Sequence, residues 1–244
     1  MHELNILLKI EFRRAFKNKL FVASIVIGLA LAAGAFIQTV VPHIDVLGGY
    51  DGSVASYPHS VFTSWMGIGI GYDIWATVYL YVCILLAALP YCSTFVKDNN
   101  SQYILQYYSR ISKNRLHIAK FITTFVVGGL IVVIPLLVNL IATMMFVPAL
   151  KPIENGLFMG NGSSFMNALF VRHTFIYTIV YILQYFIYGG AFSVIALAAS
   201  YIFSNSFLVM LTPFVVFYGL GVVSNMLRNC LLYTSPSPRD GATS

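Results

Sequence analysis

Residues 121–147 read Phe121-Ile-Thr-Thr-Phe-Val-Val-Gly-Gly-Leu-Ile-Val-Val-Ile-Pro-Leu-Leu-Val-Asn-Leu-Ile-Ala-Thr-Met-Met-Phe-Val147. The stretch contains no Asp, Glu, Lys or Arg, and it exceeds the about 20 residues that a helix needs to cross a bilayer. It therefore predicts a transmembrane helix.

The composition extends this prediction to the whole chain. Hydrophobic residues make up 59% of the 244 residues and charged residues 9%, whereas globular proteins have about 45–50% and about 25%. So few charges cannot form a soluble surface, which disfavours a disordered chain, a nucleic-acid-binding module and a soluble enzyme. The formal net charge is +6, but its basic residues are sparse and clustered between apolar runs. An integral membrane protein is expected.

Four further apolar runs are long enough to span a bilayer and carry no Asp, Glu, Lys or Arg. We expect an all-α membrane domain over 19–229 whose five spans are Leu20–Val41, Ile74–Val96, Phe121–Val147, Thr174–Phe203 and Phe207–Leu227. Small residues four positions apart, such as Gly28 with Ala32 and Gly189 with Ser193, predict close helix packing.

The basic residues predict the orientation. Segments 42–73 and 148–173 contain only two basic residues, Lys151 and Arg172. Ten basic residues lie before the first span or between the second and third: Lys9, Arg13, Arg14, Lys17, Lys19, Lys97, Arg110, Lys113, Arg115 and Lys120. Because cytoplasmic loops are rich in Lys and Arg, the N-terminus and the 97–120 loop are predicted to be cytoplasmic.

The last fifteen residues, 230–244, have a different character. Cys230-Leu-Leu-Tyr-Thr-Ser-Pro-Ser-Pro-Arg-Asp240 resembles the translation of a transposase adaptor used in sequencing libraries, the alternative being a polar Ser/Pro linker. We interpret 230–244 as a non-native tail and the chain as a truncated metagenomic fragment. A sixth span is expected to follow Asn229 in the native sequence.

Residues 2–18 predict a separate amphipathic helix. Leu4, Leu8, Phe12, Ala15 and Phe16 form one helical stripe, and basic residues occupy the rest of the helix. An apolar stripe with a basic face is typical of a helix that lies in the membrane interface. The alternative is a charged stub that flanks the first span.

The sequence lacks the groups that catalysis or nucleotide binding would need. It has no G-x-x-x-x-G-K-[ST] loop, no Asp, Glu, Lys, Arg or His inside a predicted span and no His pair at metal-ligand spacing. We predict no catalytic residue, no metal and no cofactor. The polar residues inside the spans, which we expect to bond to other helices, are Gln38, Asn139, Gln184 and Asn225.

The loop 97–120 contains an aromatic cluster. Tyr103, Ile104, Tyr107 and Tyr108 fall on one face of a short predicted helix, with Arg110 close behind. Aromatic residues with Arg are typical of protein interfaces, whereas the alternative is a solvated turn that holds the topology by its charge. Ser112 lies where an N-cap would start the helix of the third span.

This layout resembles the permease subunits of type-2 ABC exporters. The resemblance rests on the basic N-terminal helix and on four short segments: Pro90-Tyr-Cys-Ser-Thr-Phe-Val-Lys-Asp98, Ser101-Gln-Tyr103, Ser109-Arg-Ile-Ser112 and Ala119-Lys-Phe121. Tyr57-Pro-His-Ser-Val-Phe-Thr-Ser-Trp65 is similar to one branch of that family. It implies six spans, an N-terminal elbow helix, and a 97–120 coupling loop that contacts a separate ATPase subunit, which would bind ATP. The implied partners are that ABC ATPase, a second permease copy or homologue and the lipid bilayer, without nucleic acid.

The leading hypothesis is therefore the membrane permease subunit of an ATP-driven ABC export system. We expect it in the bacterial cytoplasmic membrane, with its N-terminus cytoplasmic. The main alternative is a non-transporting membrane scaffold or an immunity-type binding subunit, and an intramembrane enzyme ranks third. Drugs, peptides, lipid-linked sugars and ions all fit as substrates, and both a homodimer and a heterodimer fit the layout.

Overall fold

A computed structural model describes residues 2–41, 60–67, 74–100, 113–149 and 167–234. In these ranges the regular secondary structure is entirely α-helical, as the sequence predicts. In chain order the helices are α1 (His2–Phe16), α2 (Lys19–Thr39), α4 (Val61–Ser64), α5 (Ile74–Asn100), α7 (Lys113–Phe146), α8 (Asn167–Arg172), α9 (Thr174–Ala199) and α10 (Ser206–Thr234).

Four of these helices are long and apolar enough to cross a membrane. They are α2, α7, α9 and the Ser206–Arg228 part of α10. The described side chains of α5 add the shorter apolar stretch Ile74–Pro90. The chain is therefore a multi-pass membrane protein by length and composition. The count of five spans stays a prediction.

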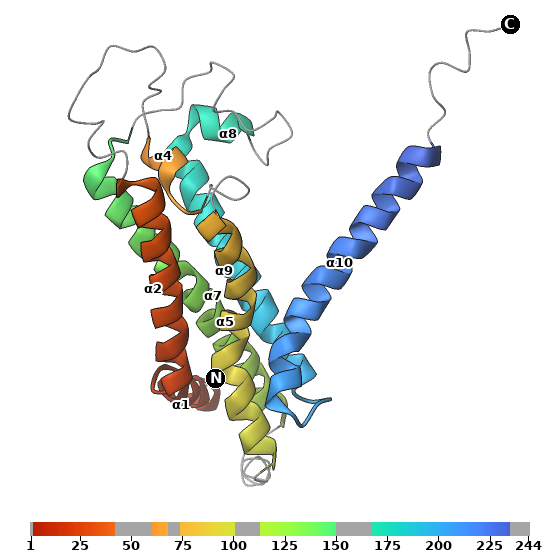
Figure 1. The fold of residues 1–244 in the computed structure, drawn as a ribbon. Coiled ribbons are helices and arrows are strands. Elements are labelled where there is room, and N and C mark those ends of the chain that lie inside the picture. The colour runs from red at the N-terminus through yellow and green to blue at the C-terminus, as the bar shows by residue number, and fades with distance from the viewer. Residues whose placement is uncertain (1, 42–59, 68–73, 101–112, 150–166, 235–244) are drawn as a thin grey trace, which may run out of the picture.

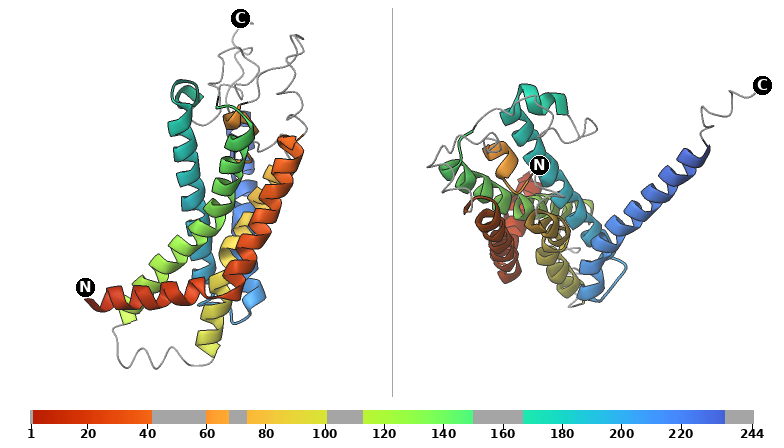
Figure 2. Two further views of the ribbon diagram at one scale, coloured as in Figure 1. Left: turned by 90° about the vertical axis from the view of Figure 1, so that its left-hand side faces the viewer. Right: turned by 45° about the horizontal axis from the view of Figure 1, so that its top comes forward.

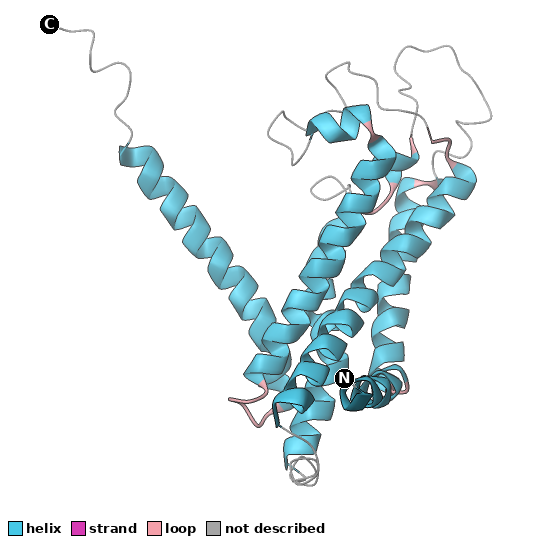
Figure 3. Ribbon diagram, turned by 180° about the vertical axis from the view of Figure 1, so that it is seen from behind, coloured by secondary structure: helices cyan, strands magenta, loops and turns pink. Residues whose placement is uncertain are grey.

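The long helices are arranged as a bundle with a short helix across one end. α2, α5, α7 and α9 lie side by side, and α7 contacts each of the other three (Figure 1). α1 lies across one end of this bundle (Figure 2), whereas α4 and α8 lie at the opposite end. α10 starts beside α5 and α9 and then diverges from the bundle (Figure 3).

The observed helix ends agree with one prediction and correct another. α7 begins at Lys113, directly after Ser112, as expected for the helix that leads into the third span. α9 ends at Ala199, so the prediction of a span to Phe203 is wrong. The Ser200 hydroxyl bonds to the Leu197 carbonyl there, and Asn205 Oδ1 accepts from the Phe207 amide 3.0 Å away at the start of α10. These polar side chains make a turn inside an otherwise apolar run.

Glycines set the closest helix crossing, between α7 and α9. A Cβ added to Gly128 would lie 2.3 Å from Ser193 Oγ, and one added to Gly189 would lie 2.7 Å from Val132 Cγ2. Ser193 Oγ donates to the Thr124 carbonyl at 2.8 Å across the same crossing. Small residues with a hydroxyl bond are a common way to associate helices where no hydrophobic effect acts between them.

Candidate functional site

Three helices meet at one end of the bundle, where exposed basic side chains gather. α1 crosses this end and contacts α2 and α7. α5 ends there at Asn100, and α7 begins there at Lys113. We call this region the basic-end junction and define it as α1, Asn18, Pro90 and the 113–120 turns of α7.

Asn18 connects the α1–α2 corner to α5. Its Oδ1 accepts a hydrogen bond from the Leu20 amide at 3.1 Å, which caps the start of α2. Its Nδ2 donates to the Pro90 carbonyl oxygen at 2.8 Å. One side chain therefore orders a helix start and holds it to a second helix.

An apolar contact connects α1 to α7. Leu7 is buried together with Leu116 and Ala119, and Leu8 packs partly against them. Leu116 and Ala119 lie one turn apart on α7, so they form a small apolar seat for α1. This contact places α1 against the first turns of α7.

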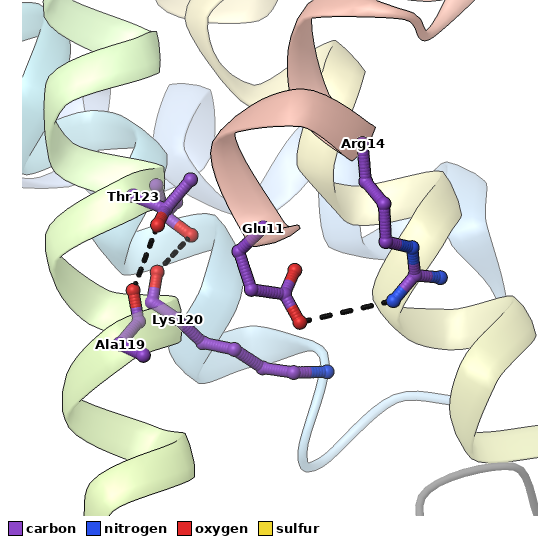
Figure 4. A network of polar contacts seen from close by, with 6 residues as sticks. Glu11, Arg14, Ala119, Lys120 and Thr123 are labelled. Carbon is purple, nitrogen blue, oxygen red and sulfur yellow. Dashed lines mark hydrogen bonds and ion pairs between the residues drawn. The ribbon is translucent and has the colours of Figure 1, made fainter. Parts of the chain in front are cut away.

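Two buried charges continue the same contact. Glu11 on α1 and Lys120 on α7 are each 4% exposed. Glu11 lies four residues after Leu7, and Lys120 lies four residues after Leu116. Figure 4 shows both side chains extending into the space between the two helices, with Lys120 reaching toward the side where Glu11 meets Arg14. Arg14 Nη1 lies 3.7 Å from Glu11 Oε1. A buried charge without compensation is strongly destabilising. We therefore expect the opposite charges of Glu11 and Lys120 to compensate each other.

The turn between α9 and α10 also reaches the start of α7. His117 Nδ1 and the Tyr201 hydroxyl lie 2.8 Å apart, and the two rings are 5.7 Å apart. The turn that ends α9 is therefore attached one residue beyond Leu116. The first turns of α7 thus contact α1 on one side and the α9–α10 connection on another.

The predicted coupling residues lie outside the described residues. Tyr103, Ile104, Tyr107, Tyr108 and Arg110 all fall between the end of α5 and the start of α7. Their role stays a prediction. The structure does place the two helix ends that flank this segment, Asn100 of α5 and Lys113 of α7.

The predicted interfacial stripe is only partly outward-facing. The structure describes no side chain for Leu4. Leu8 and Phe12 are half-buried against other helices, and Ala15 is buried with Phe21. Phe16 is 43% exposed. The helical period located α1, but it did not reveal that part of the stripe packs on protein.

The opposite end of the bundle is filled by residues 60–67, which we call the plug. Val61 and Trp65 are 0% exposed. The Met66 amide donates to Asn139 Oδ1 at 2.9 Å, and Asn139 Nδ2 donates to the Ala32 carbonyl at 2.9 Å. Asn139 of α7 therefore holds both the plug and α2, which agrees with the prediction that it bonds to another helix.

A column of aromatic rings runs along α9 from the plug. Successive ring centroids of Tyr177, Tyr181 and Tyr185 are 5.6 and 5.4 Å apart, and Trp65 meets Tyr181 edge-on at 6.3 Å. Among the described side chains, Trp65 Nε1 and Gln184 Oε1 are buried polar atoms without a hydrogen-bond partner.

Sequence reasoning missed the plug and the two buried charges. The plug segment is too short for a span, and its burial depends on bonds to residues far along the chain. Glu11 and Lys120 looked like ordinary charges at the ends of spans. Their spacing of four from Leu7 and Leu116 was the available signal, because it places them on the same helix faces as those leucines.

Four long apolar helices, a helix across the bundle end and tight small-residue crossings define a multi-pass helical membrane protein. Comparisons of the chain with protein-family models, with curated proteins and with solved structures find no match.

Proposed function

We propose that the chain is the membrane permease subunit of an ATP-driven export system of the type-2 ABC kind. It works with a separate ATPase subunit that binds ATP and with a second permease copy or homologue. In this proposal 97–120 contacts the ATPase, α1 is the elbow helix, and the N-terminus faces the cytoplasm. The proposal rests on the sequence layout and on the contacts of the basic-end junction.

The observation that carries the proposal is that α1 and the corner between α1 and α2 are attached to the two helices that flank the 101–112 segment. Asn18 holds the Pro90 carbonyl of α5, and Leu7 sits on Leu116 and Ala119 of α7. A push on 101–112 would therefore move α5, α7 and α1 together. An ATPase that acts on a chain without its own nucleotide loop needs such a rigid attachment.

α7 can carry this movement to the opposite end. Its 34 residues span about 51 Å at about 1.5 Å per residue, longer than the about 30 Å hydrocarbon core. Its far half carries Asn139, which holds the plug through the Met66 amide. A helix that is driven at one end and bonded to a plug at the other can open or close a path.

The test is co-expression with the ABC ATPase encoded beside the gene in an intact genomic locus. We expect the two proteins to purify together in detergent. A cysteine placed at Tyr107 should then form a cross-link to the ATPase, whereas a cysteine at the exposed Ile37, at the opposite end of α2, should not. The scaffold alternative predicts no ATPase beside the gene and no cross-link at either position.

A further inference from the structure

The outward face of α1 combines positive charge with apolar side chains. Its inward residues Leu7, Glu11 and Ala15 are buried. The outward residues fall at i, i+3, i+4, i+7, i+10 and i+11, which is one continuous helical face, and all are exposed: Ile6, Lys9, Ile10, Arg13, Phe16 and Lys17. We call these six residues the outer face.

The charge of the outer face is positive without an acidic residue among its members. Lys9, Arg13 and Lys17 repeat every four residues, and like charges at this spacing destabilise a helix unless an anion lies beside them. The nearest described acidic side chain, Glu11, points inward and is paired with Arg14. The arrangement separates the acid from the cations and leaves the cations facing out.

The apolar members show which kind of anion fits. Ile6, Ile10 and Phe16 are 48%, 41% and 43% exposed and alternate with the cations along the face. α1 lies across the end of the long helices, so it can lie along the surface of a bilayer that those helices cross (Figure 2). Apolar side chains can enter the boundary between headgroups and acyl chains, while Lys and Arg extend their charges to the headgroups.

We propose that the outer face of α1 is a binding surface for anionic phospholipid headgroups. The lipid leaflet is the one at the end of the bundle that α1 crosses (Figure 2). This surface shares only Phe16 with the predicted stripe. The other described members of that stripe, Leu8, Phe12 and Ala15, pack at least partly against protein. The proposal is independent of whether the chain belongs to an exporter.

The test measures lipid retention by the full chain. The protein is incorporated in mixed phosphatidylcholine and phosphatidylglycerol vesicles, extracted in mild detergent, and its bound lipids are counted by native mass spectrometry. Arg13→Gln and Lys17→Gln should each reduce the phosphatidylglycerol-to-phosphatidylcholine ratio about fivefold at low salt, which corresponds to about 1 kcal/mol per basic residue near a membrane. Lys17→Arg keeps the charge and should retain the ratio.

The matched control is Lys113→Gln with Arg115→Gln, which removes two positive charges from the same end but none from α1. It should leave the ratio close to that of the unmodified chain. An N-terminal accessibility label checks that the single variants keep their orientation. Unchanged ratios in Arg13→Gln and Lys17→Gln would overturn the proposal, and so would an equal loss in the control. A loss of protein partners with the lipid ratio intact would show that the face binds a soluble acidic surface instead.

Discussion

Asn18 and Pro90 are 72 positions apart in the chain, yet Asn18 Nδ2 donates a hydrogen bond to the Pro90 carbonyl oxygen at 2.8 Å. The same side chain caps α2 through the Leu20 amide. The corner between α1 and α2 is therefore held to α5 at Pro90. This contact connects the end of α1 to α5, the helix that leads into the proposed coupling segment.

The two roles of Asn18 can be separated by substitution. Asn18→Ser keeps a capping oxygen but loses the reach to Pro90, whereas Asn18→Ala loses both interactions. We expect Asn18→Ser to cost about 0.5–1.5 kcal/mol and Asn18→Ala about 1 kcal/mol more. Thermal unfolding in detergent gives the order of stability. Equal stability of Asn18→Ser and the unmodified chain would show that the Pro90 contact contributes nothing.

The glycine crossing predicts a position-dependent response to one added methyl group. Gly128→Ala should destabilise the protein by about 1–3 kcal/mol, because its Cβ would lie 2.3 Å from Ser193 Oγ. Gly221→Ala is the matched control, since no atom lies within 4 Å of its Cβ, and alanine favours a helix by up to about 1 kcal/mol. Thermal melting of both variants compares them. A neutral Gly128→Ala would contradict the described crossing.

The buried charges of α1 and α7 predict a strong coupling between two substitutions. Glu11→Gln removes the opposite charge near Lys120 and should cost up to about 3–5 kcal/mol, whereas Lys120→Met leaves Glu11 with Arg14 at 3.7 Å and should cost less. The double variant removes both charges and should be more stable than either single variant. A double-mutant cycle from denaturation midpoints measures the coupling. Strictly additive losses would mean that the two side chains do not interact.

The hydrogen bonds of Asn139 predict that this residue holds the plug in place. Asn139→Leu removes the acceptor of the Met66 amide and the donor to Ala32, so the plug should be held less tightly. We expect faster labelling of a cysteine placed at Ser64, by roughly tenfold if about 1.4 kcal/mol of holding energy is lost. Asn225→Leu, at an exposed site on α10, serves as the control and should leave the labelling rate unchanged. An unchanged labelling rate in Asn139→Leu would show that Asn139 does not hold the plug.

The membrane helices could be predicted because they are long runs without charge, a property of each run alone. Their ends depend on single polar groups, so the turn at Ser200 was missed inside an apolar run. The face of α1 that meets protein could not be predicted, because a helical period identifies a stripe but not its partner. The burial of Trp65 depends on Asn139 and Tyr181, which lie far along the chain, and local sequence does not contain that pairing.

The central claim is that the 101–112 segment passes the work of an ATPase into α5 and α7. ATP-dependent export, measured in inside-out vesicles that contain this protein with the ATPase from its locus, tests it most directly. Tyr107→Ala and Arg110→Ala should each insert normally and retain ATP hydrolysis, yet lose most of the export that hydrolysis drives. Arg172→Ala, at an exposed position on α8 at the opposite end of the bundle, should retain export. Unchanged export per ATP hydrolysed in both Tyr107→Ala and Arg110→Ala would contradict the account.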